Sequence, residues 1–505
     1  MAFVLLSAVF IAVTVLLRFW TRSPLWLDEA QSVAIARLPL SGHGMTIWAA
    51  LRHDGSPPLY YLLLHGWISL FGTGSLAVRA LSGVLSLASF PLLWLLGRIL
   101  VGRRAAIAAV LLLASSPFDV RFATETRMYS LLVVLALVGG LALHRILTEG
   151  PGLVPVLGLA LISGGLALTH YWSFYLLLTV SGGLVALALR RPAHRRRAGW
   201  SLSGIGLGAL VFAPWLPAFG YQLAHTGTPW GEPAGFAAVV HAFGEWTGGP
   251  SAIGRALLLV IAALLVLAVF GTPVDRRHVL LDLRGRDPGR WLLGLTLGTL
   301  VVAIAVGQLV GNAWADRYTA TAFVPFLLVA GLGVTALQSR RLAAGTVAIA
   351  CLLGFAESAA DITTNRTSAG RVAAVINRVA RPGDIVLTCP DQLGPALSRL
   401  VRPGIPVLGV PTLTPSARVD WVDYAARQRA AKPAVVAAAA LRRVTGSGQV
   451  FLVEAAGYRT YDSVCPGVSG ALAAARPAVR TLVTDPAKTY EHEELLLFPT
   501  RAGGR

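Results

Sequence analysis

The stretch "HDGSPPLYYLLLHGWISLFG", residues 53–72, decides how the rest of the chain is arranged. The question is whether the apolar run after the two prolines crosses a membrane or lies along its surface. The run holds only about 15 residues, below the lower limit of about 17 that a spanning helix needs. Pro57 and Pro58 can open a helix, and Gly72 can end one. We therefore expect an aromatic-rich helix in the outer interface, with a short buried crossing helix as the alternative.

The composition of the chain is that of a polytopic membrane protein. Of the 505 residues, 55% are hydrophobic and 13% are charged, and the mean hydropathy is +0.66. These values exclude an ordinary soluble domain. The net charge of +19 could indicate nucleic-acid binding, but the arginines cluster in short loops between apolar runs, which membrane topology explains. No RNA-binding or DNA-binding module is recognisable, so we expect no nucleic-acid partner.

Eleven apolar stretches are candidates for transmembrane helices. They are residues 3–20, 78–98, 104–118, 128–146, 152–170, 173–190, 199–217, 252–271, 291–311, 318–337 and 341–358. The first lacks the basic start and the Ala-x-Ala exit of a cleavable signal peptide, so we expect it to be retained as a span. The third is short as an apolar run and borrows flanking residues up to Phe122.

Arginine-rich loops set the expected orientation of these spans. The arginine-rich loops are residues 98–104, 190–197, 276–290 and 340–341. The positive-inside rule places all of them in the cytoplasm, and the spans alternate without conflict only if residues 58–72 do not cross. The N-terminus is then cytoplasmic. The expected protein is a multi-pass plasma-membrane protein, with a transmembrane catalytic domain at residues 1–358 and an extracytoplasmic domain at residues 359–505.

The first two external loops place charged and polar residues on one side of the membrane. These residues are Asp28, Glu29, His53, Asp54, Arg79, Glu125, Arg127 and Tyr129. Carboxylates at the top of a membrane domain are costly unless they are solvated, paired or bound to a cation. Taken singly, each pair has a structural explanation, since Asp28 and Glu29 could cap a helix and Arg127 could pair with Glu125. Their shared side of the membrane favours chemistry, because sugar transfer from a phosphate needs a carboxylate base and cations for the leaving group.

Three segments of the chain resemble a known family. Residues 25–40, 53–83 and 111–132 look like the opening modules of the GT-C superfamily of glycosyltransferases, which are integral membrane enzymes that use polyprenyl-phosphate sugars. The nearest relatives by this resemblance are protein O-mannosyltransferases, lipid A aminoarabinose transferases and RgtA/B/C/D-like glycosyltransferases. The resemblance is specific over about residues 20–140 and weakens in the later spans. It implies a GT-C fold of about 11 transmembrane helices with periplasmic juxtamembrane helices.

The resemblance also implies roles for residues of the first two loops. The family's Asp-Glu pair matches Asp28 and Glu29 as catalytic residues, and the Asp of that pair is the presumed base. The family's Asp-x-His-Pro-Pro stretch is matched with its Asp retained and its His replaced by Ser56, which puts an acceptor or metal role of this loop in doubt. Five further residues would bind the acceptor or the sugar, or would have a structural role. They are His53, Asp54, Arg79, Glu125 and Tyr129.

A polyprenyl phosphate would keep its phosphate at the level of the lipid headgroups, where arginine, histidine or tyrosine at external helix ends could bind it. The family's late Arg-Tyr pair, which contacts the lipid phosphate, matches Arg317 and Tyr318. Arg127, His170 and Tyr171 are further candidates for the donor phosphate. Anchoring of aromatic and basic side chains at the interface is the alternative for each.

These features together predict an inverting glycosyltransferase. It would move a sugar, mannose or arabinofuranose, from a polyprenyl-phosphate donor to an extracytoplasmic hydroxyl of a glycan, lipid or protein acceptor, with Asp28 as the general base. A transporter or flippase of lipid-linked glycans is the alternative, although no internal repeat supports it. No cofactor is required. A divalent cation held by Glu29, Asp54 or Glu125 is allowed, but no ligand spacing requires one.

The C-terminal region changes to mixed polar sequence with short apolar runs. Strands are expected near residues 384–388, 405–410, 449–455 and 494–499, and helices near residues 370–380, 392–401 and 433–443. This alternation predicts a small α/β domain with a largely parallel sheet. The region carries no recognisable catalytic motif. If it is extracytoplasmic, Cys389 and Cys465 could form a disulfide, and two free thiols are the alternative.

Overall fold

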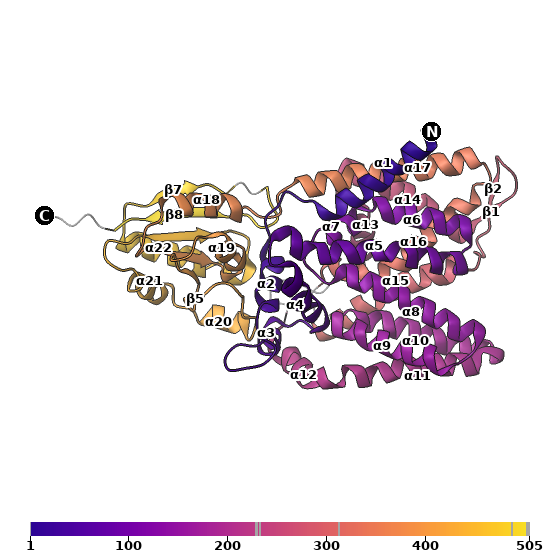
Figure 1. Cartoon of the computed structure of the whole chain (residues 1–505), viewed down its shortest axis with the longest axis horizontal. Coiled ribbons are helices and arrows are strands. Elements are labelled where there is room, and N and C mark those ends of the chain that lie inside the picture. Colours follow the sequence, from indigo (N-terminus) through magenta and orange to yellow (C-terminus); the bar gives the residue numbers. More distant parts are fainter. Residues whose placement is uncertain (1, 228–230, 232–233, 312–313, 486–487, 501–505) are drawn as a thin grey trace.

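The computed structural model describes residues 2–227, 231, 234–311, 314–485 and 488–500. A bundle of long helices forms one end of the molecule and a sheet with its helices forms the other (Figure 1). Three short helices of the first long loop (residues 20–74) lie between the two ends, namely α2 (Leu27–Ala36), α3 (Ile47–Asp54) and α4 (Leu59–Phe71). The first helix, α1 (Ala2–Phe19), begins in the half of the bundle that lies away from the sheet.

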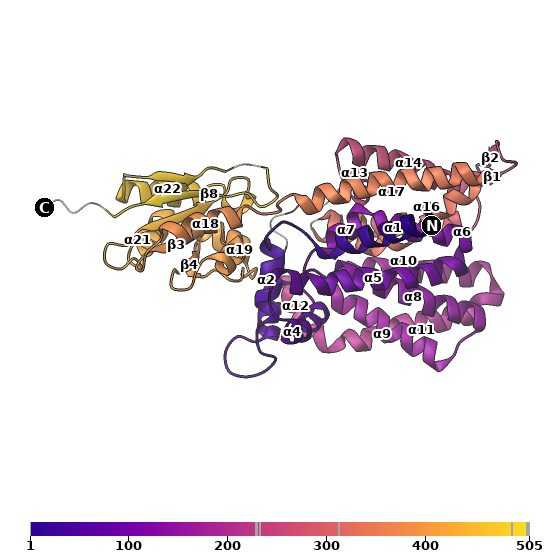
Figure 2. The ribbon, with the colours of Figure 1, turned by 45° about the horizontal axis from the view of Figure 1, so that its top comes forward.

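Eight helical segments among the described residues are long and apolar enough to cross a membrane. Their principal helices are α5 (Ser75–Leu100), α8 (Tyr129–Glu149), α10 (Ser173–Arg190), α11 (Arg195–Phe212), α14 (Ala252–Phe270), α15 (Gly289–Val310), α16 (Ala320–Gly333) and α17 (Arg340–Thr363). α16 is buried along its whole length and forms the centre of the bundle. α17 runs along the bundle and leads into the C-terminal region (Figure 2).

The remaining predicted spans are shorter or bent. α6 (Arg103–Ser115) and α7 (Pro117–Ala123) form a pair bent by 55°, which makes a ninth span if the two are counted as one. Pro117 opens α7 and offers no amide hydrogen to continue the preceding helix, which explains the break. α1 (Ala2–Phe19) and α9 (Leu153–Thr169) are short apolar helices at the other two predicted positions. Each predicted stretch therefore coincides with a helix.

α4 is the apolar helix of residues 53–72. It has 13 residues, so its length of about 20 Å falls short of the hydrocarbon thickness of about 30 Å. One face, with Tyr60, Tyr61 and Leu64, is buried against the protein, while Leu70 and Phe71 are exposed. In Figure 1 the helix lies at the end of the bundle that adjoins the C-terminal region. This position is that of a helix at the rim of the bundle.

Short elements complete the membrane part of the chain. They are the loop helices α12 (Leu216–His225) and α13 (Ala237–Trp246), and the two-stranded hairpin of β1 (Gly271–Pro273) and β2 (Val279–Leu281). The hairpin belongs to an arginine-rich loop and lies at the end of the bundle farthest from the C-terminal region (Figure 1).

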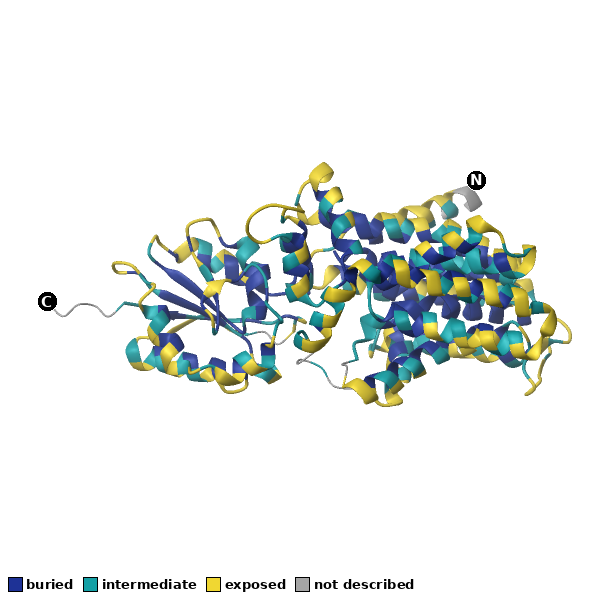
Figure 3. Cartoon of the chain, turned by 90° about the horizontal axis from the view of Figure 1, so that it is seen from below, coloured by how far each residue is buried: buried dark blue, intermediate teal, exposed yellow. Residues whose placement is uncertain are grey.

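The C-terminal region is an α/β domain around a six-stranded sheet. Its strands are β3 (Ile385–Cys389), β4 (Val407–Gly409), β5 (Thr414–Pro415), β6 (Val450–Glu454), β7 (Arg480–Val483) and β8 (Glu494–Phe498), in the order β5-β4-β3-β6-β8-β7. Its helices are α18 (Ala369–Val379), α19 (Gly394–Leu400), α20 (Tyr424–Ala430), α21 (Pro433–Leu441) and α22 (Val464–Ala475). The central strands are buried (Figure 3). The predicted multi-pass helical protein with a C-terminal α/β domain is confirmed.

The sheet is mixed, so the prediction of a largely parallel sheet was wrong. β3 pairs in parallel with β4 and β6, but β5, β7 and β8 all pair antiparallel. A parallel pair needs a crossover of about a dozen residues or more. Only a short turn separates β4 from β5, and the described residues between β7 and β8 form no helix, so in both cases the chain returns antiparallel. Cys389 and Cys465 form a disulfide.

Candidate active site

A cavity of about 820 Å³ lies where the bundle, the first long loop and the C-terminal region meet. Seven of the predicted site residues line it: Asp28, Asp54, Arg127, His170, Tyr171, Arg317 and Tyr318. Residues far apart in the sequence therefore share one chamber.

Asp28 stands between two arginines inside this cavity. It lies in the first turn of α2, where Ser32 donates a hydrogen bond to its carbonyl oxygen at 2.7 Å. Its Oδ2 atom is 3.8 Å from Nε of Arg127 and 3.8 Å from Nη2 of Arg317. This oxygen has no hydrogen-bond partner among the described residues, and the side chain is 18% exposed. The carboxylate is therefore held by charge while it can still accept a hydrogen bond from a substrate hydroxyl.

Glu29, the neighbour of Asp28, faces the protein interior instead. Its fully buried carboxylate accepts two hydrogen bonds from Arg79, at 2.7 Å from Nε and 2.6 Å from Nη2. The backbone amide of Thr126 donates a third at 3.0 Å. Arg79 also donates to the carbonyl oxygens of Ser23 and Pro24. Glu29 thus ties α2 to the start of α5 and to the segment between α7 and α8, and this arrangement sets the direction in which Asp28 points.

The two arginines near Asp28 are positioned from different parts of the chain. Arg127 donates to the hydroxyls of Ser32 and Tyr61 at 3.2 and 3.3 Å. Arg317 belongs to a short 3-10 helix before α16, and its guanidinium lies 5.3 Å from the ring centroid of Tyr318. Such a pair of guanidinium groups in a cavity is suited to bind a phosphate.

Aromatic and amide side chains support the other walls of the cavity. The ring of His170 lies 4.7 Å from that of Tyr318. The hydroxyl of Tyr171 accepts from Nε1 of Trp215 at 2.9 Å and donates to the amide oxygen of Gln222. These contacts fix the rings at the rim of the bundle.

Asp54 and His53 diverge although they are adjacent in the sequence. Asp54 lines the cavity and accepts from the hydroxyl of Tyr61 at 3.0 Å and from the amide of Gln31. His53 turns to the C-terminal region, where its Nδ1 lies 3.0 Å from Oδ1 of Asp420. Its carbonyl oxygen accepts from the backbone amide of Trp421. His53 therefore connects the first long loop to the C-terminal region.

Two further predicted residues lie outside the cavity lining. Glu125 pairs with Arg121 at 3.2 Å, and the buried Tyr129 packs on Phe122 with ring centroids 4.5 Å apart. Within the described parts of the chain, no group of three or more His, Cys, Asp or Glu side chains is placed to hold a metal ion. The three carboxylates suggested for a cation are each engaged with different partners.

One wall of the cavity is formed by residues of the C-terminal region, where the sequence predicted no site residue. Tyr458, Arg459, Tyr490, Glu491 and His492 all line the cavity. The backbone of Glu491 bonds to that of residues 366 and 368, which brings the segment before β8 against the end of the bundle. No local motif marks these residues, because only long-range packing brings them to the cavity.

The pH dependence of protein stability tests the buried position of Glu491. It is 2% exposed, and burial raises the pKa of Glu491 to about 8. The pKa of an unfolded glutamate is about 4.3, so folding takes up a proton and the wild-type stability falls as pH rises from about 5 to 8. We expect Glu491→Gln to match the wild-type thermal midpoint at pH 5 and to exceed it by a few degrees at pH 8.5. Asp462→Asn, at an exposed site, is the control, and an equal shift at both pH values would contradict the prediction.

The cavity also has an apolar side. Leu178 of α10 and Val306 and Val310 of α15 line it together with the polar residues. Both helices are long and apolar enough to cross a membrane, so candidate spans form this side of the cavity.

Comparison with known proteins finds one matching protein family. Residues 55–217 match the protein family described as dolichyl-phosphate-mannose-protein mannosyltransferase. None of the curated protein sequences matches the chain.

Solved structures match almost the whole chain. ArnT from Cupriavidus metallidurans in the apo state matches with a TM-score of 0.60 and 14% identity, covering 100% of both chains. The same protein bound to undecaprenyl phosphate matches with a TM-score of 0.59 and 15% identity, covering 99% of both chains. The archaeal oligosaccharyltransferase AglB from Archaeoglobus fulgidus matches with a TM-score of 0.51 and 11% identity, covering 96% of this chain and 73% of that one. The predicted fold is confirmed, because the chain shares the fold of the ArnT and AglB structures over almost its whole length.

Proposed function

We propose that the protein is an inverting glycosyltransferase that moves a sugar from a polyprenyl-phosphate donor to an acceptor hydroxyl outside the membrane. The observation that carries this proposal is the carboxylate of Asp28, within 3.8 Å of two guanidinium groups in a cavity with an apolar side. Mannose or arabinofuranose is the sugar that we favour, and the acceptor is a glycan, a lipid or a protein. The match to a mannosyltransferase family supports the donor class.

The two sides of the cavity suit the two parts of such a donor. Arg317 and Arg127 are placed to bind the phosphate, with Tyr318, His170 and Tyr171 as the surrounding wall. The polyprenyl tail would leave between α10 and α15, along Leu178 and its neighbours. The similar ArnT structure was solved with undecaprenyl phosphate bound, which agrees with a lipid phosphate as ligand.

The proposed reaction is a single displacement. Asp28 takes the proton from the acceptor hydroxyl while that oxygen attacks the anomeric carbon. The bond from this carbon to the phosphate oxygen breaks, and the electron pair leaves with the phosphate, where Arg317 and Arg127 stabilise the charge. The attacking oxygen approaches opposite the leaving group, so the anomeric configuration inverts.

We propose that residues 359–505 are extracytoplasmic and that the N-terminus is cytoplasmic, in a plasma-membrane protein. The support is the distribution of arginine. The hairpin loop with Arg276 and Arg277 lies at the end of the bundle opposite the C-terminal region and the cavity (Figure 1). The positive-inside rule puts that end in the cytoplasm.

The function is tested with purified protein in lipid vesicles, given a radiolabelled polyprenyl-phosphate mannose or arabinofuranose and a membrane extract as the source of acceptor. We expect loss of the labelled donor, release of polyprenyl phosphate and a labelled product. Movement of the intact donor across the vesicle membrane, without cleavage of the sugar-phosphate bond, would overturn the proposal and support a transporter.

A further inference from the structure

A second cavity, of about 140 Å³, lies within the C-terminal region. Its polar lining includes Asp391, Ser416, Arg418, Asp420, Arg427 and Gln428. Asp391 closely follows the end of β3, and the lining also includes Gly409, the last residue of β4. The two strands are parallel, so the cavity lies at their carboxyl ends. Open α/β sheets bind ligands at this edge.

Gln428 is the feature of this cavity that most needs a ligand. Its side chain is 1% exposed, and neither the amide nitrogen nor the amide oxygen has a hydrogen-bond partner among the described residues. A buried amide without partners lowers stability unless something supplies them. A ligand with hydroxyl groups can do so, because a hydroxyl both donates and accepts.

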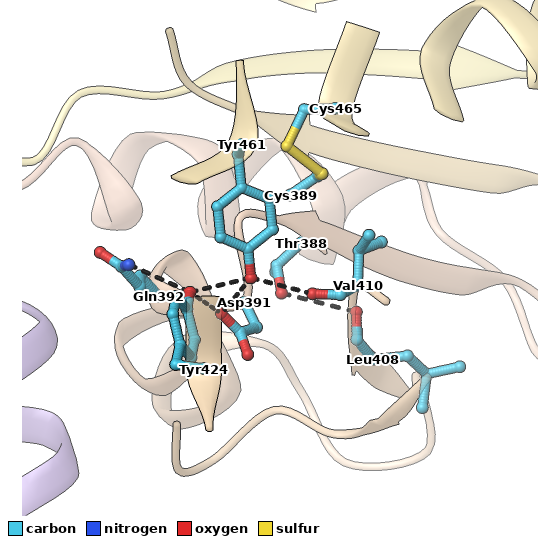
Figure 4. The surroundings of a disulfide bond; sticks show 9 residues. All are labelled: Thr388, Cys389, Asp391, Gln392, Leu408, Val410, Tyr424, Tyr461 and Cys465. Carbon is cyan, nitrogen blue, oxygen red and sulfur yellow. Dashed lines mark hydrogen bonds between the residues drawn. A yellow bond between two sulfur atoms is a disulfide. The ribbon is translucent and has the colours of Figure 1, made fainter. Parts of the chain in front are cut away.

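Asp391 offers a second fixed polar group. Its Oδ1 atom accepts hydrogen bonds from Tyr424 and Tyr461, both at 2.7 Å (Figure 4). The other carboxyl oxygen points away from the two tyrosines. The disulfide from Cys389 to Cys465 lies beside this group and fastens the end of β3 to α22. The carboxyl group is thus held in one orientation before any ligand enters.

The charges around the cavity balance. Arg427 pairs with Asp420 at 3.0 Å, and Arg418 and Asp391 contribute one further charge of each sign. An anionic ligand would gain nothing from such a lining. Hydroxyl groups can pair with carboxylate, guanidinium and amide groups alike, and the volume limits the ligand to about one ring.

We propose that this cavity is a second binding site, for a single neutral sugar unit. The proposal rests on the proposed function only in taking that unit to belong to the glycan acceptor. The position supports this, since Gln392 and Trp421, the neighbours of Asp391 and Asp420, line the main cavity. An acceptor glycan held here by one unit would present another unit to Asp28.

The test measures binding directly, without transfer. Full-length protein in lipid nanodiscs is titrated with the neutral disaccharides mannobiose and arabinofuranobiose, and with a disaccharide that contains glucuronic acid, by saturation-transfer NMR. We expect one of the neutral disaccharides to bind and the acidic one to bind more weakly. Gln428→Leu should lower the affinity for the neutral disaccharide about tenfold, because the hydrogen bonds of the amide are lost.

Two further variants and one further measurement separate the possible explanations. Arg429→Leu, the next residue of the same helix and exposed, should bind as the wild type does. Gln428→Leu should keep or raise the thermal midpoint, since an apolar side chain removes an unpaired buried amide, so weaker binding would not reflect unfolding. Asp28→Asn should retain binding, whether or not the wild type proves to be a transferase. Wild-type affinity in Gln428→Leu, no binding of either neutral disaccharide, or preference for the acidic disaccharide would each overturn the proposal.

Discussion

Replacing Asp28 with asparagine is expected to lower the rate of sugar transfer about a thousandfold while the protein stays folded. General-base catalysis by a positioned carboxylate contributes about 10²- to 10⁴-fold, and asparagine cannot take up the proton of the acceptor. The change is nearly isosteric. The side chain is partly exposed to the cavity and its Oδ2 atom has no hydrogen-bond partner among the residues that the structure describes, so little packing is lost. The turnover number should therefore fall at saturating donor.

The matched variant is Asp28→Glu, which keeps the carboxylate but moves it by one methylene. We expect it to recover part of the transfer rate that Asp28→Asn loses. Donor binding, followed by retention of labelled donor on the purified protein, should survive in both variants because Arg317 and Arg127 remain. Transfer at the wild-type rate by Asp28→Asn would show that another group acts as the base.

Glu29→Gln is expected to destabilise the protein by about 3–5 kcal/mol. The change removes one charge of a buried ion pair and leaves Arg79 without its counterion, and breaking such a pair costs an amount of this order. Arg79→Met should cost a similar amount for the same reason. The measurement is the unfolding midpoint in denaturant, with the purified protein in detergent.

The double variant Glu29→Gln with Arg79→Met distinguishes an ion pair from general damage. If the two groups act as a pair, the double variant should be more stable than the sum of the single losses predicts. Arg145 and Glu149 supply the control, because this pair is 61% and 66% exposed and Glu149→Gln should change stability by no more than about 1 kcal/mol. A loss of similar size in Glu29→Gln and Glu149→Gln would contradict a structural role for Glu29.

The placement of the spans could be predicted from the sequence for a local reason. A helix crosses the bilayer when its apolar run is long enough, and arginine in the adjoining loops orients it. Both properties can be counted along the chain. The shortness of residues 58–72 was therefore enough to expect α4 at the rim of the bundle, and the same reasoning placed Asp28, Arg127 and Arg317 near one another.

The sheet shows where local patterns end. Apolar runs in the sequence predicted β3, β4, β6 and β8, but the direction in which each strand pairs depends on the connection between strands. β5 has two residues and β7 is largely exposed, so neither carries an apolar run that would announce it.

The fold of the membrane part and the residue types suited to sugar transfer could be predicted from the sequence, since hydrophobic length and charge are properties of local segments. How those residues are arranged depends on contacts that form only in the folded chain. Asp28 and Glu29 are adjacent in the chain, yet Asp28 faces the cavity and Glu29 is buried against Arg79, because their side chains leave the first turn of α2 in different directions. Likewise, Glu491 reaches the cavity from the far end of the sequence through packing contacts that no local pattern encodes.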